Sequence, residues 1–318
     1  HAWNFNTHRK ITADALKRMP PSFQMRFGSY KDTILKGTTD PDMLLKDFQN
    51  HVYHIHTQHP DKNQVSGLRF QELFLLITEL LKGKESAGSS NARLKAALNQ
   101  RTVQTQNEQI AYQLGLYSHY IADINQPLHT DGGEVDPREK DYHMKFEKDV
   151  ESQLSKIPLA PYSAVPVTDP MERMLTMAKA SNEGYLEIGR AYREGNKILD
   201  LKDLLKVRYN AAVQSVIDFW YGVFQAAGQP LEPLQAVPTA SSPALNLLVE
   251  EKPLYQGPKV NLNTASLEEL MKLPMVGEKK AQAIMNARPF KSTYDLAKVK
   301  GFGIRLVEKI ADRLFVEP

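Results

Sequence analysis

The stretch LGLYSHYIADINQPLHTDGGEVDPREKDYHMKFEKD, residues 114–149, decides how the rest of the chain is read. It contains five potential metal ligands: His119, Asp123, His129, His143 and Glu147. The first two are four residues apart, and so are the last two. On a helix, residues at this spacing project from one face about 5–6 Å from each other. Each pair can therefore bind one metal ion, and the additional histidine indicates more than one ion.

The donor types in this stretch favour zinc. The chain has no cysteine, so a metal must be held by nitrogen and oxygen donors. Neutral imidazoles and carboxylates without thiolate are the ligands that catalytic zinc accepts. Pairs of opposite charge at this spacing also stabilise ordinary surface helices. That reading explains one pair well but not two pairs and a further histidine, because the whole chain has only nine histidines.

Length and composition allow two domains in a chain of 318 residues. No run of 18 apolar residues occurs, so we expect no stable insertion into a membrane. The net charge of +3 does not by itself require a nucleic-acid partner.

The sequence SHYIADINQPLH followed by YHMKFE is similar to the zinc-dependent phospholipase C family and its relatives, the single-strand-specific zinc nucleases. The resemblance covers roughly residues 3–228. It implies a mostly helical domain with three zinc ions that hydrolyses phosphodiester bonds.

The resemblance also implies a set of ligands for three sites. The first would use Trp3, His8 and Asp123; the second Asp42, His51, His119 and a bridging Asp123; the third His129, His143 and Glu147. Asp42 would also act as the base or orient the attacking water. Asp40, His54 and His56 stay open as alternatives to Asp42 and His51.

The amino terminus bears on the first site. In the family, the tryptophan chelates zinc through its α-amino nitrogen and carbonyl oxygen, which Trp3 can do only if His1 and Ala2 are absent. A first residue other than methionine favours a removed signal peptide. We therefore expect a secreted or periplasmic bacterial protein.

Apolar periodicity predicts helices across the first domain, residues 1–228. Thr7 is placed to cap the first helix, and later helices are expected at about 66–84, 91–118, 170–194 and 199–227. Residues 229–258 are rich in proline and read as a linker.

Residues 259–318 form a second pattern, in which a helix, a glycine turn and a helix occur twice. The expected helices are 265–272, capped by Asn263 or Thr264, then 278–287, 292–299 and a last one ending near 314. This pattern resembles the tandem helix-hairpin-helix domain of bacterial competence DNA-binding proteins. The expected fold class is thus all-α: a phospholipase C/nuclease-type helical domain followed by a small tandem helix-hairpin-helix domain.

The second module concentrates positive charge. It has eleven Lys and Arg against seven Asp and Glu, a net +4, which leaves −1 for the rest of the chain. Backbone amides at a helix N-terminus suit a DNA phosphate. The expected DNA contacts are Gly277, Lys279, Lys280, Gly301, Gly303, Arg305 and Lys309. Met275 departs from the motif, which usually has glycine there, and such modules also mediate protein contacts.

Three functions compete. The second module and the short spacing from Trp3 to His8 favour an endonuclease acting on DNA or RNA. The HMKFE element looks more like phospholipase C, which would act at a phospholipid surface. However, that enzyme's choline pocket uses an acid before the first histidine and an aromatic after the aspartate. Here those places hold residues 4–7, NFNT, and Met43. The third reading is a non-catalytic DNA-binding protein.

Overall fold

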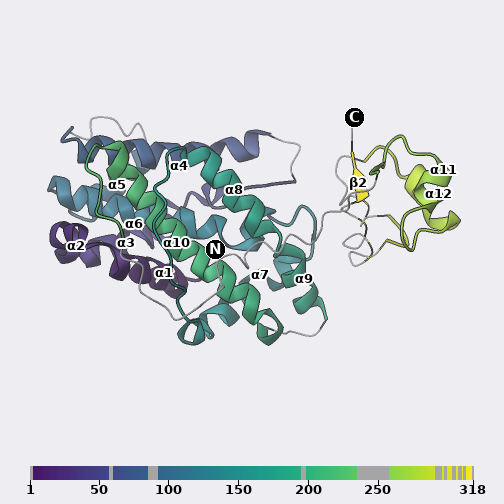
Figure 1. Ribbon diagram of the computed structural model, residues 1–318, viewed down its shortest axis with the longest axis horizontal. Helices are drawn as coiled ribbons and strands as arrows, with labels where there is room; N and C mark the ends of the chain where they lie inside the picture. Colours follow the sequence, from purple (N-terminus) through teal and green to yellow (C-terminus); the bar gives the residue numbers. More distant parts are fainter. Residues whose placement is uncertain are drawn as a thin grey trace. The chain divides into compact units, whose positions relative to one another are not determined.

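The computed structural model (Figure 1) describes residues 3–56, 60–84, 92–194, 198–234, 258–290, 296, 299–302, 306, 310 and 313–316. The chain divides into two compact units. The first, called the N-terminal unit below, consists of His1–Gly133 and Arg138–Leu245; the second, the C-terminal unit, consists of Glu134–Pro137 and Asn246–Pro318. Helices dominate both units, so the predicted all-α fold class is confirmed.

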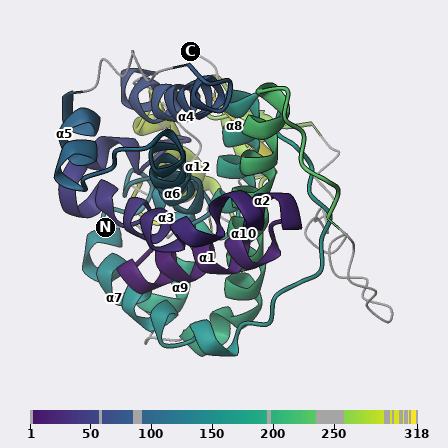
Figure 2. The same cartoon turned by 90° about the vertical axis from the view of Figure 1, so that its left-hand side faces the viewer.

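The N-terminal unit is built of ten helices within the part of the chain that the structure describes. They are α1 (Phe5–Arg18), α2 (Pro21–Phe27), α3 (Lys31–Gly37), α4 (Pro60–Leu81), α5 (Ala92–Gln100), α6 (Gln106–Ile124), α7 (Glu139–Glu151), α8 (Pro170–Asn182), α9 (Tyr185–Arg193) and α10 (Lys202–Ala226). Helix α6 lies at the centre, in contact with α1, α3, α4 and α10 (Figure 2). Every side chain from Ile110 to Ile124 is buried, so the polar residues on α6 need partners inside the protein.

Two glycines bring α3 and α6 into direct contact. A Cβ atom at Gly115 would lie 2.0 Å from the carbonyl oxygen of Ile34, and one at Gly37 would lie 2.1 Å from that of Tyr112. No side chain larger than hydrogen fits at either position. The segment that follows α3 is thereby held beside the carboxyl-terminal half of α6, which carries His119 and Asp123.

Aromatic side chains fill the core around α6. Trp220 of α10 stacks on Phe23 with ring centroids 5.4 Å apart, and its indole nitrogen donates to the carbonyl oxygen of Leu114. Phe219 packs edge-on against Phe70 and Tyr117. All five rings are fully buried, and aromatic pairs of this kind contribute about 0.5–1.5 kcal/mol beyond burial.

Three expectations for the N-terminal unit are wrong in detail. Thr7 is not the cap of α1, because the helix begins earlier and the carbonyl oxygen of Asn4 accepts from Thr7 and His8. The helix expected at 91–118 is two helices. Thr105 starts α6 with a capping box to Glu108, and Thr102 before it has a left-handed backbone with φ 53°.

The helix expected at 170–194 is also divided, into α8 and α9. Gly184 precedes α9, and a Cβ there would meet the Leu204 side chain at 2.6 Å. Gly184 therefore lies where the side chain of Leu204 on α10 packs against the break between α8 and α9.

The C-terminal unit contains α11 (Leu267–Met271), α12 (Glu278–Asn286) and two short strands, β1 (Val260–Asn261) and β2 (Leu314–Phe315). The strands pair in parallel with Val260 opposite Leu314, a contact that the sequence pattern does not predict. The cap of α11 is Ser266 in a capping box with Glu269, not Asn263 or Thr264. The Asn263 side chain instead bonds both backbone groups of Phe290. The expected helix 292–299 and most of the last helix lie outside the described residues.

Among the helices that the structure describes, none has the length and apolar character needed to cross a membrane.

Candidate metal centre

Five segments of the N-terminal unit bring eight of the nine predicted ligand side chains together in three groups. The groups are His8 with His119 and Asp123; Asp42 with His51 and His119; and His129 with His143 and Glu147. Within each group the potential ligand atoms lie within 4.8 Å of one another. Helix α1 supplies His8, the segment after α3 supplies Asp42 and His51, and α6, the turn after it and α7 supply the rest.

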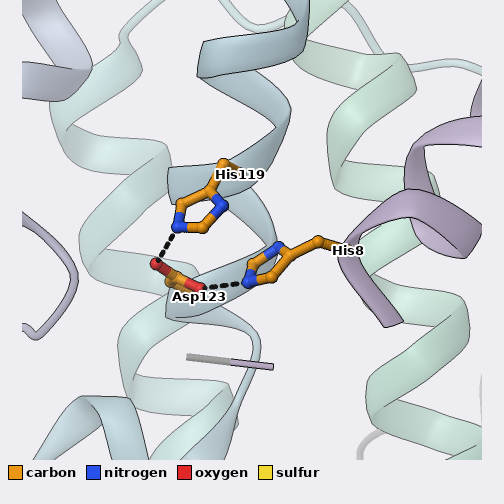
Figure 3. Close-up of side chains that lie close together, drawn as sticks. All are labelled: His8, His119 and Asp123. Atoms are coloured by element: carbon orange, nitrogen blue, oxygen red, sulfur yellow. Dashed lines mark ion pairs between the residues drawn. The ribbon is translucent and has the colours of Figure 1, made fainter. Parts of the chain in front are cut away.

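Asp123 lies at the centre of the first two groups. Its Oδ1 is 3.1 Å from Nε2 of His8, while its Oδ2 is 2.9 Å from Nδ1 of His51 and 3.3 Å from Nε2 of His119. Figure 3 shows the Asp123 carboxylate between the rings of His8 and His119. One oxygen thus faces one histidine and the other oxygen faces two, which is the arrangement a carboxylate bridging two ions needs.

These close approaches are not hydrogen bonds. Both oxygens of Asp123 and both ring nitrogens of His8 are buried, and none has a partner with hydrogen-bond alignment. Buried polar atoms are normally satisfied, and leaving such a group unsatisfied costs about 1–3 kcal/mol. The orphaned atoms of His8 and Asp123 therefore point to a cation that they share.

In each of the other four histidines, one ring nitrogen faces the other ligands and the second ring nitrogen bonds to a protein oxygen. Nδ1 of His119 donates to the carbonyl oxygen of Thr38, and Nδ1 of His129 to that of His51, both at 2.8 Å. A carbonyl oxygen can only accept, so Nε2 of both rings carries a lone pair in the neutral form.

Carboxylates hold the other two rings. Oδ1 of Asp47 lies 3.4 Å from Nε2 of His51, and Oε1 of Glu139 lies 2.7 Å from Nδ1 of His143. The nitrogens left over face each other: His119 Nε2 and His51 Nδ1 are 3.1 Å apart, and His129 Nε2 and His143 Nε2 are 3.2 Å apart. Two lone pairs at this distance repel unless a proton or a metal ion lies with them. The residues therefore fit zinc.

Asp47 and Glu139 are functional residues that the sequence reading missed. Asp47 is buried and accepts hydrogen bonds from Tyr120 and Arg69. Glu139 is buried and accepts one from Tyr185. A carboxylate bound to the outer nitrogen of a metal-binding histidine fixes the ring and raises its basicity. Each acid precedes its histidine by four residues, and that spacing is the signal that could have found both.

The electrostatics agree with a cation site. Burial, helped by the charge of His119, lowers the pKa of His8 to about 4, so that His8 is neutral. Burial also works against a charged His51 and a charged His143. The neighbouring carboxylates, Asp123 and Asp47 for His51 and Glu139 and Glu147 for His143, outweigh it and raise both pKa values to about 9. Without a metal these rings hold a proton, which a bound metal would displace.

Burial alone would raise the pKa of Asp123. The interaction with the neighbouring imidazoles, His119 first, outweighs burial, and the pKa of Asp123 lies well below its usual value.

The alternative ligands have other partners. Asp40 is buried and forms a two-point ion pair with Arg101, with a hydrogen bond from Tyr112. His54 contacts the carbonyl oxygen of Asp131, and His56 contacts the side chain of Asn182. None of the three belongs to the metal-binding groups found among the described residues. Asp42 and His51 therefore fit the second group better.

Trp3 is fully buried, and its indole donates to the carbonyl oxygen of Ala122, next to Asp123. This hydrogen bond ties the tryptophan to the segment of α6 that carries the central carboxylate. Chelation by its backbone stays a prediction.

In the C-terminal unit, the first hairpin turn runs from Leu273 to Gly277, which caps α12. Met275 has φ 62°, the left-handed conformation that favours glycine, so the turn forms despite the departure from the motif. Lys279 is exposed, whereas Lys280 donates to the carbonyl oxygen of Met275. Gly301 has φ 95° at the second turn. Gly303, Arg305 and Lys309 lie outside the described residues.

Comparison with protein families finds two matches. Residues 7–192 match the model for zinc-dependent phospholipase C, and residues 256–315 match the helix-hairpin-helix motif. The two matches together cover most of the chain and coincide with the two sequence patterns.

Several curated proteins are similar over short stretches. A deoxyribonuclease from Thioalkalivibrio is 41% identical over 54 residues, 17% of this chain and 15% of the relative. ComE operon protein 1 from Bacillus subtilis is 41% identical over 66 residues, 20% of this chain and 32% of the relative. The chain thus spans at most a third of the length of these relatives.

Among solved structures, alpha-toxin from Clostridium perfringens aligns with 70% of this chain and 64% of its own length. The TM-score is 0.42 and the sequence identity is 14%.

Proposed function

Because the chain belongs to the zinc-dependent phospholipase C family, we propose that it is a zinc-dependent phosphodiesterase whose substrate is a nucleic acid. The observation that carries the reaction class is the meeting of lone-pair nitrogens and orphaned carboxylate oxygens around Asp123. The observation that favours nucleic acid is the helix-hairpin-helix match in the same chain. A DNA-binding module tethered to the hydrolytic unit raises the local concentration of substrate.

The proposed ligand assignment gives each histidine one ion. His119 belongs to two of the groups, but its Nδ1 is used by Thr38, and the single lone pair of Nε2 binds one ion. We assign His119 with Asp42, His51 and Asp123 to one ion, and His8 with Asp123 and Trp3 to another. His129, His143 and Glu147 hold a third.

Bound zinc would lower the pKa of a coordinated water and offset the charge of a phosphodiester. The chain's own residues decide where the substrate enters. The side chains of His8, His51, Asp123, His129 and Glu147 are at most 3% exposed, whereas Asp42 is 13% and His143 is 18% exposed. Asp42 is thus the ligand carboxylate that solvent reaches. We assign it the role of orienting the attacking water and accepting its proton.

The alternative is a phospholipase C, which the name of the matched family favours. Against it, no aromatic residue follows Asp42; Met43 stands there and is half exposed. The segment before His8 also has no acid for a choline pocket: Asn4 lies there, and its side chain donates to that of Glu151.

One experiment separates these functions. The purified full-length protein with zinc is tested on single-stranded DNA, duplex DNA, RNA and phosphatidylcholine vesicles. We expect nucleotide release that Asp42→Asn and chelation abolish, while His56→Ala, outside the metal-binding groups, retains activity. Phosphorylcholine release without nucleotide release would support phospholipase C. DNA binding without any hydrolysis would support the non-catalytic reading. Location outside the cytoplasm stays a prediction for cell fractionation to test.

A further inference from the structure

The C-terminal unit has a groove of about 510 Å³ beside its first hairpin. Strand β1, helix α11 and the end of β2 form its walls, and Leu273 at the start of the hairpin turn is one of its lining residues. The volume is in the range of small-ligand sites, which measure about 300–1,000 Å³. The hairpin residues expected from the sequence to bind DNA do not include any residue of this groove.

The lining of the groove carries an excess of basic residues. Lys259 and Lys272 are exposed, and Arg313 is a third basic lining residue. Glu269 is the one carboxylate among the described lining residues. Its side chain accepts from the backbone N–H of Ser266 in the capping box at the start of α11. Because that carboxylate is engaged by the helix end, the excess charge of the groove favours an anion.

The lining of the groove is part polar and part apolar, and it includes the aromatic ring of Phe315. Phe315 is partly exposed, although its backbone is fixed by pairing with Asn261 and by the hydrogen bond from Leu262 to its carbonyl oxygen. Val260 and Leu273 contribute aliphatic surface beside it. An aromatic ring among basic lining residues matches a planar base joined to a phosphate, since bases stack on aromatic side chains while basic residues track the backbone.

We propose that this groove binds one unpaired nucleotide of a nucleic-acid single strand. The base stacks on Phe315, and the phosphate lies at Lys259 and Lys272. The inference rests on the proposed function and deepens it by naming single-stranded nucleic acid as the preferred ligand. Leu273 lies in both the groove and the hairpin turn, so a strand whose phosphate contacts the turn amides passes the groove mouth. A paired base cannot enter, because it is held in the duplex.

The test measures binding rather than hydrolysis, which separates it from the proposed function. The probe is a fluorescent twelve-residue thymidine oligonucleotide with hydrolysis-resistant phosphorothioate links, compared with a phosphorothioate duplex of equal length. Full-length Phe315→Leu removes the ring but keeps an apolar side chain, and Phe315→Trp keeps a stacking surface. We expect Phe315→Leu to weaken single-strand binding about tenfold, duplex binding to change less than twofold, and Phe315→Trp to bind like the wild type.

Two further variants guard against misfolding. Lys272→Glu changes an exposed side chain in the groove and should weaken single-strand binding selectively. Lys279→Glu, beyond the hairpin turn, should weaken single-strand and duplex binding alike. Equal losses on both ligands for Phe315→Leu and Lys272→Glu, or no loss on either, would overturn the groove proposal. Selective binding of these probes, together with no hydrolysis of unmodified nucleic acid in the activity assay above, would overturn the nuclease proposal and leave the groove standing.

Discussion

The ring of His129 is joined to the backbone of His51: its Nδ1 donates to the carbonyl oxygen of His51 at 2.8 Å. This hydrogen bond links the third metal-binding group to the second. It uses the backbone of His51, so it survives replacement of the His51 side chain. The groups are therefore structurally connected but can lose their ligands separately.

Metal content follows from this arrangement. We expect close to three zinc ions per chain in the wild type, two in His143→Ala and one in Asp123→Asn, because Asp123 faces two groups and His143 one. Elemental analysis after gel filtration measures the ratio. His54→Ala is the matched control, since His54 bonds the Asp131 carbonyl and should leave the zinc content unchanged. One ion or none in the wild type contradicts the assignment.

The orienting carboxylates should tune metal affinity without being ligands. Asp47→Asn and Glu139→Gln keep the shape of each side chain but weaken its hold on His51 and His143. Loss of such a partner typically lowers metal affinity 10–100-fold. Competition with a zinc chelator measures the effect. Both variants should still bind the full number of ions at saturating zinc, and a lost ion at saturation would show that the acid is itself a ligand.

Four ligands, two on α6 and two on α7, could be predicted from local sequence because each pair lies at helical spacing. The assignment of Trp3, His8, Asp42 and His51 depends on the family resemblance. The role of Asp47 could not be predicted from local sequence. Its burial depends on Arg69 and Tyr120, which are distant in sequence and meet it only in the folded unit. The sequence does not exclude Asp40 as a ligand for the same reason: its partners Arg101 and Tyr112 are 61 and 72 residues away.

Helices could be predicted correctly where the apolar periodicity continues. The predicted bounds are wrong where a local signal interrupts it. Thr105 and Glu108 start a new helix within the apolar pattern read as 91–118, and their spacing is itself a capping-box signature. Gly184 could not be interpreted from sequence alone, because packing against Leu204 of α10 decides what it does.

The ion pair between Asp40 and Arg101 should stabilise the helical turn Pro41–Leu45, which carries Asp42. Arg101→Met leaves a buried carboxylate with Tyr112 as its remaining partner among the hydrogen bonds described above. We expect the free energy of unfolding to fall by about 3 kcal/mol. Denaturant unfolding measures this loss. Lys82→Met, which removes an exposed pair with Glu79, should change it by less than about 1 kcal/mol. Equal effects would contradict a structural role for Asp40.

Asp218 should make stability depend on pH. Burial raises its pKa to about 7, against the opposing effects of the Val165 N–H and Arg173. The folded state therefore holds the proton more tightly than the unfolded chain. This stabilisation is fully present below the unfolded pKa near 4 and is lost as pH rises through 7. The variant Asp218→Asn has no carboxyl group that titrates at this position.

The unfolding free energy of wild type minus Asp218→Asn isolates this group, because other titrations occur in both proteins. We expect that difference to favour the wild type more at pH 5 than at pH 8. A difference that is constant over this range would mean that Arg173 keeps Asp218 ionised throughout.

The two units should divide binding and hydrolysis between them. All proposed metal ligands precede residue 150, so deletion of residues 259–318 should leave turnover nearly intact. The Michaelis constant on long single-stranded DNA should rise at least about tenfold, because the tethered module no longer raises the local substrate concentration. A dinucleotide has a single phosphodiester, which the metal centre uses, so both proteins should hydrolyse it equally.

Salt dependence distinguishes this explanation from a loss of stability. Phosphate contacts release counterions, so the advantage of the full-length protein on long DNA should shrink steeply between 50 and about 200 mM salt. Replacement of exposed Lys279 by glutamine should reproduce a smaller part of the loss, because the turn amides of the hairpin remain. The measurement is steady-state kinetics of full-length and truncated protein on long and dinucleotide substrates at the two salt concentrations. Equal losses of turnover on both substrates would instead assign the C-terminal unit to stabilising the metal centre, since a purely binding module acts only on substrates long enough to reach it.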